Sequence, residues 1–155
     1  MTAADHAEGL NHAREYLEET GALLAELTSR EEQLITLREI GEELPPMDPA
    51  LKTQEHMVPG CASATYVITE IKPDERVYFH MDSESFISKG YLYILMEALN
   101  GCTAEDLLKN VEPYVQAFAE DAGVRLSMLA SRANVFERVF RFMQKQILEQ
   151  MASSE

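Results

Sequence analysis

The feature of this sequence that most restricts its fold is a pair of short apolar runs separated by a turn. Residues 64–71 read ATYVITEI and residues 76–81 read RVYFHM, so both runs are rich in β-branched and aromatic side chains. The intervening KPDE carries the proline and aspartate that are typical of turns. The pattern predicts an antiparallel β hairpin, because strands of this composition pair readily through a short turn.

An apolar helix is predicted directly after the hairpin. The segment ESFISKGYLYILMEALNG, residues 84–101, places large apolar side chains at helical spacing. Gly101 stands where a residue in the left-handed conformation commonly ends a helix. Asp82 and Ser83 precede the segment and are predicted to cap it. This composition is typical of a buried helix.

Further helices are predicted on both sides of this unit. Ser29 and Glu32 form a capping box for a helix that ends before Pro45 and Pro46. Short helices follow from Thr103 and over residues 111–123. A long closing helix over residues 131–151 carries a wide apolar stripe: Val135, Phe136, Val139, Phe140, Phe142, Met143 and Ile147. The order of elements predicts an α+β fold, a small antiparallel sheet packed against helices.

Length and composition favour one domain. A chain of 155 residues with 46% apolar residues is long enough to bury a substantial core. We expect residues 1–20 to form an N-terminal extension, residues 21–150 the domain, and residues 151–155 a C-terminal tail.

The charge balance excludes two classes of partner. The chain has 13 basic and 27 acidic residues, a net charge of −14, which is unfavourable for binding nucleic acid or an anionic membrane. No apolar run approaches the roughly 18 residues that a membrane span requires, and the first twenty residues lack an apolar signal core. We therefore expect a cytoplasmic protein.

The two cysteines, 41 positions apart, stand in different sequence contexts. Nothing marks the chain as secreted, so both are expected to be free thiols. A cysteine retained for packing behaves as a small hydrophobic residue. Cys102 fits that role at the end of the predicted buried helix. Cys61 instead follows Pro59 and Gly60 in a predicted turn, which makes it the candidate for chemistry.

The turn could make Cys61 a nucleophile. Gly60 can adopt a positive φ, which would point successive backbone N–H groups at the sulfur. A thiolate in such a site can attack the outer sulfur of a persulfide and carry it. From the residues alone, a loop cysteine without a role fits as well, and a pairing with His56 or His80 would require proximity in the fold. No metal site is expected, because neither cysteine has a second ligand at metal-binding spacing.

Four blocks of the sequence closely resemble the SufE family of sulfur-acceptor proteins. They run in order from about residue 22 to 147: LPPMDPAL, HMVPGCASATYV, VYFHMDSESFISKGYLYILMEALNGCTAEDLL and LSMLASRANVFERVFRFMQ. The resemblance implies an α+β sandwich like that of iron–sulfur scaffold proteins. It also implies that Cys61 accepts persulfide sulfur from a cysteine desulfurase, stimulates that enzyme and delivers sulfur for iron–sulfur cluster assembly.

The same resemblance implies the residues that shape the site or bind the partner. They match the family's Gly-Cys-x-Ser motif, its Asp-Ser pair and its Arg-x-Asn block at the desulfurase-facing surface: Gly60, Ser63, Asp82, Ser83, Arg132 and Asn134. The family has glutamine where this chain has Ala62 and glycine where it has Val135, two differences that could mark a paralogue serving a different desulfurase.

The resemblance implies a carrier that works with an enzyme rather than a stand-alone enzyme. The pyridoxal phosphate belongs to the desulfurase, and the chain itself needs no cofactor beyond the persulfide on Cys61. Its expected partners are a cysteine desulfurase and an iron–sulfur scaffold or other sulfur acceptor. The oligomeric state stays open, with a homodimer as one candidate. The alternative is an adaptor that binds and activates the desulfurase without transferring sulfur.

Overall fold

The computed structural model describes residues 3–125 and 130–153, with side chains described for residues 8–121 and 135–153. In chain order, the helices and strands are α1 (Ala3–Glu26), α2 (Arg30–Gly41), the single-turn 3-10 helices η1 (Pro49–Leu51) and η2 (Gln54–His56), β1 (Thr65–Ile71), β2 (Val77–Ser83), α3 (Phe86–Leu99), α4 (Ala104–Lys109), α5 (Glu112–Arg125) and α6 (Ala130–Ser153).

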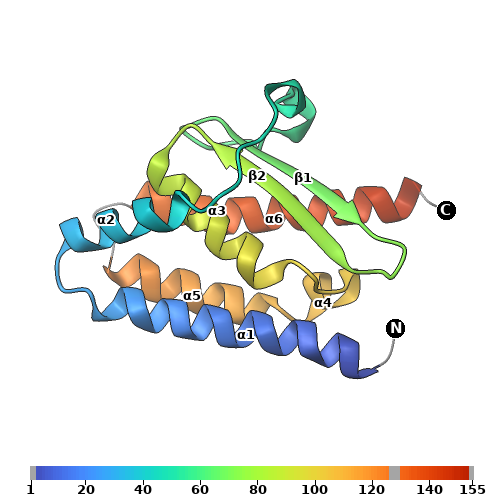
Figure 1. Cartoon of the computed structure of the whole chain (residues 1–155), viewed down its shortest axis with the longest axis horizontal. Helices are drawn as coiled ribbons and strands as arrows, with labels where there is room; N and C mark the ends of the chain where they lie inside the picture. The colour runs from blue at the N-terminus through green and yellow to red at the C-terminus, as the bar shows by residue number, and fades with distance from the viewer. Residues whose placement is uncertain (1–2, 126–129, 154–155) are drawn as a thin grey trace.

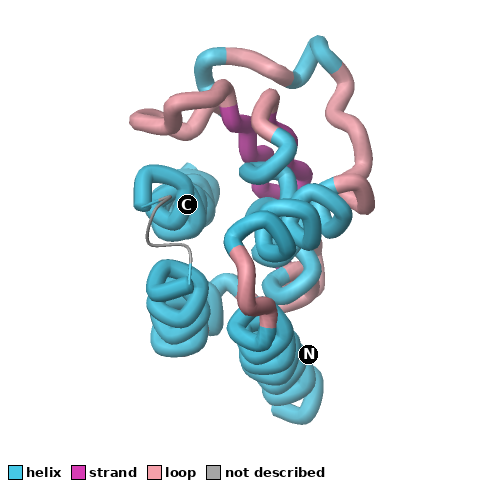
Figure 2. The backbone as a smooth tube through the Cα atoms, turned by 90° about the vertical axis from the view of Figure 1, so that its left-hand side faces the viewer, coloured by secondary structure: helices cyan, strands magenta, loops and turns pink. Residues whose placement is uncertain are grey.

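The elements lie in layers. The hairpin and the loops before it occupy one side of the molecule, α3 and α6 lie beneath them, and α1 and α5 lie side by side on the opposite side (Figure 1). The view turned by 90° shows the same order, with the strands above the helices (Figure 2). A small antiparallel sheet packed on helices confirms the predicted α+β fold.

The hairpin matches its prediction closely. β1 and β2 are antiparallel, with Thr65 opposite Ser83 and Ile71 opposite Val77. Alternate side chains are buried over Thr65–Thr69 of β1 and Val77–Met81 of β2, which is the pattern of a sheet with one face packed against a core. The buried face of β2 packs against α3. The hairpin is therefore held from below by the predicted apolar helix.

α6 covers the outer edge of β1. Gln146 Nε2 donates to the Val67 carbonyl at 2.8 Å, and the Thr69 hydroxyl donates to Gln146 Oε1 at 2.6 Å. Gln150 Nε2 donates to the Thr69 carbonyl at 2.6 Å. These side chains pair carbonyls that an edge strand would otherwise leave open. The seven apolar residues of the predicted stripe are all buried, as expected.

The structure corrects the predicted cap of α3. Asp82 and Ser83 are the last two residues of β2, because the strand pairing continues to the Thr65–Ser83 pair. The cap is Ser85, whose hydroxyl accepts the Ser88 N–H at 3.2 Å. The prediction was wrong because a strand that ends on polar residues looks like a helix start when only local sequence is considered.

Three other predicted helix signals are confirmed, while the helix predicted to end at Gly123 continues to Arg125. The Ser29 hydroxyl accepts the Glu32 N–H at 3.1 Å at the start of α2. The Thr103 hydroxyl accepts the Asp106 N–H at 3.2 Å at the start of α4. Gly101 follows α3 with a φ of 89°.

The N-terminal segment is part of a long helix. α1 runs through residue 20 without a break, and its Ala13, Leu17 and Leu24 are buried in the core. α6 likewise continues past residue 150 to Ser153. The division of the chain into an extension, a domain and a tail stays a prediction.

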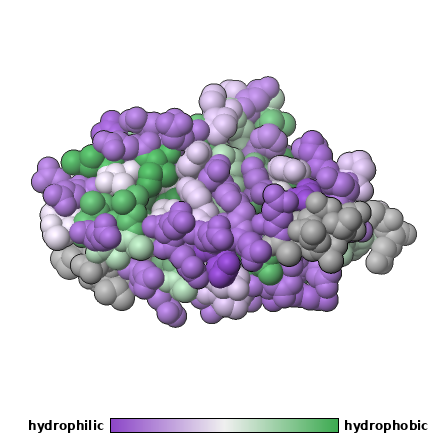
Figure 3. Space-filling model, turned by 60° about the horizontal axis from the view of Figure 1, so that its bottom comes forward, coloured by the Kyte–Doolittle hydropathy of each residue, from purple (hydrophilic) through white to green (hydrophobic). Residues whose placement is uncertain are grey.

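Figure 3 brings the lower side of Figure 1 forward and shows a mostly hydrophilic surface, with hydrophobic side chains gathered toward its left end. Within the described residues, no helix combines the length and the apolarity needed to cross a membrane.

Two glycines allow α2 and α3 to touch through their backbones. A Cβ atom on Gly90 would lie 2.3 Å from the Leu37 carbonyl oxygen, and one on Gly41 would lie 2.8 Å from the Gly90 nitrogen. Real Cβ atoms do not approach backbone atoms this closely, so both positions require glycine.

We predict that Gly90→Ala lowers the free energy of unfolding by about 3 kcal/mol, the upper part of the range for overpacked interiors. The Cβ atom would force α2 away from α3. Gly21→Ala is the matched control in α1, because a Cβ there would meet Phe118 Cδ2 at an ordinary 3.5 Å. Urea denaturation of both variants measures the difference, and equal stability of the two would contradict the close crossing.

Candidate functional site

Cys61 lies in a loop whose two ends are joined at the start of β1. The Val58 N–H donates to the Thr65 carbonyl at 2.8 Å, and Met57 forms an isolated antiparallel bridge with Tyr66. Val58 and Thr65 are both buried. The loop therefore has anchored ends, and Cys61 lies between them.

Gly60 and α6 fix the part of the loop next to Cys61. Gly60 has a φ of 80°, so the predicted positive φ is confirmed. The Arg138 guanidinium donates from Nη1 to the Gly60 carbonyl. A Cβ atom on Gly60 would lie 3.0 Å from Arg138 Nη1. Two features therefore favour glycine at this position: the positive φ, and the close approach of the Arg138 guanidinium to the place where a side chain would begin.

The thiol of Cys61 is free, half-buried and packed against the core. Burial raises the pKa of the Cys61 thiol, while the Thr65 hydroxyl and the positive charge of Arg138 act in the opposite direction. Two side chains, Thr65 and Arg138, therefore favour the thiolate, and a contribution from backbone N–H groups of the loop stays a prediction.

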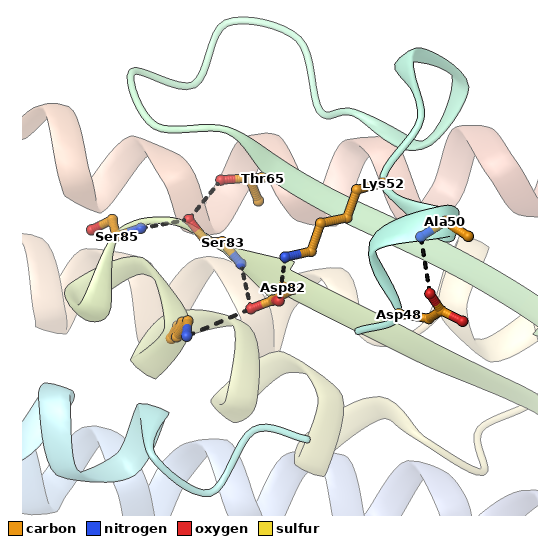
Figure 4. Close-up of polar contacts among 8 residues, drawn as sticks. Asp48, Ala50, Lys52, Thr65, Asp82, Ser83 and Ser85 are labelled. Atoms are coloured by element: carbon orange, nitrogen blue, oxygen red, sulfur yellow. Dashed lines mark hydrogen bonds and ion pairs between the residues drawn. The ribbon is translucent and has the colours of Figure 1, made fainter. Parts of the chain in front are cut away.

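A chain of hydroxyl groups connects the end of β2 to the base of the loop (Figure 4). The Ser83 and Thr65 hydroxyl oxygens lie 3.1 Å apart, and the Ser83 oxygen also accepts the Ser85 N–H at 3.2 Å. The Thr65 hydroxyl donates to the Ser63 carbonyl at 3.0 Å. The predicted residues Ser63 and Ser83 therefore meet through Thr65, next to Cys61.

Asp82 ties three segments together at the same end of the hairpin. Its buried carboxylate accepts the Ser83 N–H at 2.9 Å. Lys52 Nζ lies 3.2 Å from Oδ2 (Figure 4). Lys89 Nζ lies 3.8 Å from Oδ1. Lys52 belongs to the proline-rich connection that leads to the loop, and Lys89 belongs to α3. A buried carboxylate with these partners fixes both segments to β2.

Of four further residues considered in the sequence analysis, two have side chains outside the described residues and the other two do not join this cluster. Arg132 and Asn134 lie in the first turns of α6, and their side chains are outside the described residues, so their roles stay predictions. His56 Nδ1 lies 2.9 Å from the Leu51 carbonyl oxygen, and His80 is exposed. Among the residues that the structure describes, no group of histidine, cysteine and acidic side chains could hold a metal ion.

Cys102 lies at the other end of the hairpin, where its carbonyl accepts the Val77 N–H at 2.9 Å. Val77 pairs with Ile71, six residues along β1 from Thr65, a separation of about 20 Å. The thiol is 1% exposed and donates to the Gly9 carbonyl at 3.4 Å. Burial, reinforced by Asp106, raises its pKa to about 12. Both cysteines are free thiols, as predicted.

Sequence reasoning missed Thr65 and a basic groove beside the loop. Pro59, Glu137, Arg138, Arg141, Phe142 and Lys145 line a cavity of about 400 Å³. A signal was present, because the three cations recur at helical spacing, three and then four residues apart. Nothing in the sequence placed that face of the helix next to Cys61.

A family model described as "SufE: Fe-S metabolism associated domain" matches residues 18–147. The chain belongs to the SufE family. A solution structure of a hypothetical protein from Thermus thermophilus shares the fold, with a TM-score of 0.66 at 20% identity over 88% of this chain and 96% of the other.

Curated relatives agree with the family. The chain is 31% identical over 130 residues to the sulfur acceptor protein CsdE of Escherichia coli, covering 84% of each. It is 32% identical over 115 residues to an uncharacterised SufE-like protein of Synechocystis, covering 74% of this chain and 69% of the relative. In SufE-like protein 1 of Arabidopsis thaliana, named as chloroplastic/mitochondrial, the match at 32% identity covers 70% of this chain but only 28% of the relative.

We predict that iodoacetamide modifies Cys61 and spares Cys102 in the folded protein. The thiolate reacts, and the pKa of about 12 together with near-complete burial leaves Cys102 almost without it at neutral pH. Because the pKa of Cys61 is also raised, its rate should increase by up to about tenfold between pH 7 and pH 8. Peptide mapping by mass spectrometry measures both sites, and label chiefly on Cys102 would contradict the assignment.

Proposed function

We propose that this protein is a sulfur acceptor for a cysteine desulfurase, with Cys61 as the acceptor. The observation that carries the proposal is the contrast between the two thiols: Cys61 is half-buried in an anchored loop, and Cys102 is buried in the core. Membership in the SufE family and the similarity to a sulfur acceptor protein of Escherichia coli support it.

The proposed step is a thiol–persulfide exchange without net oxidation. The Cys61 thiolate attacks the outer sulfur of a persulfide on the desulfurase, and a new S–S bond forms on Cys61. The S–S bond of the donor breaks, and its electron pair leaves with the donor cysteine as a thiolate. Cys61 then carries the sulfur as a persulfide and releases it to a second thiolate by the same exchange.

The surroundings of Cys61 suit a carrier. Burial raises the pKa of the thiol and limits its reaction with small oxidants and alkylating agents between transfers. When the thiolate forms, the Thr65 hydroxyl and the positive charge of Arg138 offset part of the unfavourable effect of burial on the negative sulfur. The anchored ends of the loop keep the rest of the site in place while Cys61 meets its partner.

The proposal extends to partners and location. Arg132 and Asn134 take part in binding the desulfurase, and the sulfur goes to an iron–sulfur scaffold or to another acceptor. Exchange of this kind needs a compartment that keeps thiols reduced, which is the cytoplasm for this chain.

The test is intact mass and peptide mapping after incubation with a cysteine desulfurase and cysteine. We expect a gain of one sulfur atom on Cys61, loss of that gain in Cys61→Ser, and unchanged loading in Cys102→Ser. Cys102→Ser is the matched control, because it removes the other thiol. Sulfur on Cys102, or loading that survives Cys61→Ser, would refute the acceptor role.

Desulfurase turnover separates the acceptor from an adaptor that only activates the enzyme. An acceptor variant without Cys61 should bind the desulfurase and fail to stimulate it. Full stimulation by Cys61→Ser would instead establish the adaptor.

A further inference from the structure

The loop that carries Cys61 is held at its middle by a different element from the one that holds its ends. The ends are joined to each other and to β1 through Val58, Thr65 and the Met57–Tyr66 bridge. Gly60, directly before Cys61, is bound by the Arg138 guanidinium of α6. Breaking this contact would leave the ends of the loop joined and would leave its middle held by the packing of Cys61 and by the bond from the Thr65 hydroxyl to the Ser63 carbonyl.

The Gly60 carbonyl is a weaker hydrogen-bond acceptor for the Arg138 guanidinium than a carboxylate would be. Among the described residues, Arg138 makes no ion pair, and its hydrogen bond goes to a neutral backbone carbonyl. Glu137 lines the same groove, but it is adjacent to Arg138 on the helix, and residues one position apart are poorly placed to pair with each other. A carboxylate binds guanidinium through two parallel, charge-assisted hydrogen bonds, which are stronger than a bond to a carbonyl.

The other two cations of the groove already have acidic partners. Arg141 pairs with Glu112, and Lys145 Nζ lies 3.7 Å from Glu149 Oε1. Of the three cations of the groove, Arg138 is therefore the one that makes no ion pair in the described part of the chain, and a carboxylate that enters the groove can bind it beside Glu137. The groove has a volume of about 400 Å³, which is room for a short peptide segment. Pro59 and Phe142 give it apolar surfaces against which such a segment can pack.

We propose that Arg138 is a latch on the Cys61 loop, and that an acidic segment of the sulfur-exchange partner releases it. A partner carboxylate binds the Arg138 guanidinium, and the hydrogen bond from Arg138 to the Gly60 carbonyl breaks. The loop then moves so that Cys61 lies at the groove where the partner is bound. The inference rests on the proposed function for the identity of the partner, and on the Arg138–Gly60 contact for the mechanism.

The latch makes access to Cys61 depend on Arg138. The measurement is the ratio of two alkylation rates of Cys61 at one pH, with a bulky iodoacetamide conjugate and with iodoacetamide itself. Because both reagents react with the thiolate, the ratio cancels the thiolate fraction and reports access. We expect Arg138→Gln to raise the ratio about threefold. The effect is small because a solvent-exposed hydrogen bond from a charged group contributes a stabilising free energy at the low end of the range for such bonds.

Three controls accompany this measurement. Arg14→Gln makes the same change of charge in α1, outside the groove, and should leave the ratio unchanged. Arg138→Lys keeps the charge but loses the planar fork, so its ratio should fall between those of the wild type and Arg138→Gln. Cys102 must stay unlabelled, because its modification would show general loosening of the fold. An unchanged ratio in Arg138→Gln would refute the latch.

The release step is tested with a short glycine–glutamate peptide on the wild-type chain. The peptide should raise the access ratio, while a glycine–glutamine peptide of the same length and sodium chloride at matched ionic strength should not. The same peptide should have no effect on Arg138→Gln. A wild-type ratio that is insensitive to the glutamate peptide would refute release by carboxylate.

These measurements use the free chain, so they separate the latch from the proposed function. If sulfur is loaded onto Cys61 and the ratios do not change, the latch fails and the acceptor role stands. If the ratios change as expected and no sulfur is loaded, the acceptor role fails.

Discussion

A sheet of two strands depends on other elements for its stability, and this requirement organises the molecule. An isolated hairpin is marginally stable in water. Here α3 covers the buried face, and Gln146 and Gln150 of α6 pair with the carbonyls of Val67 and Thr69 along the outer edge of β1. The edge bonds fix α6 in position along the strand. Every feature of the Cys61 environment that comes from α6 depends on this docking.

The docking of α6 brings Arg138 to the cysteine loop. Arg138 precedes Gln146 by eight residues, about 12 Å along the helix. From a contact with the middle of β1, that distance carries the helix back past the start of the strand. The Arg138 guanidinium then meets Gly60, 78 residues earlier in the chain. An interaction that completes the sheet therefore also supplies the positive charge beside the thiol.

The two thiols show how position in one fold sets cysteine chemistry. Cys102 is surrounded by the core, and burial with the nearby charge of Asp106 raises its pKa to about 12. Cys61 is only half-buried, and Thr65 and Arg138 oppose the effect of its burial. The first environment protects a packing residue. The second leaves a thiol within reach of a partner, held by an anchored loop and surrounded by polar groups from β1 and α6.

Local sequence by itself determined the hairpin, the apolar stripe of α6 and the helix ends at Ser29, Thr103 and Gly101, because caps, turns and periodicity depend on residues a few positions apart. It also marked Cys61, through its turn and the family motif. Only the tertiary structure decided that Asp82 and Ser83 end a strand and that Arg138 binds the cysteine loop. These contacts join segments far apart in the chain, and the packing of whole helices and strands sets their distances.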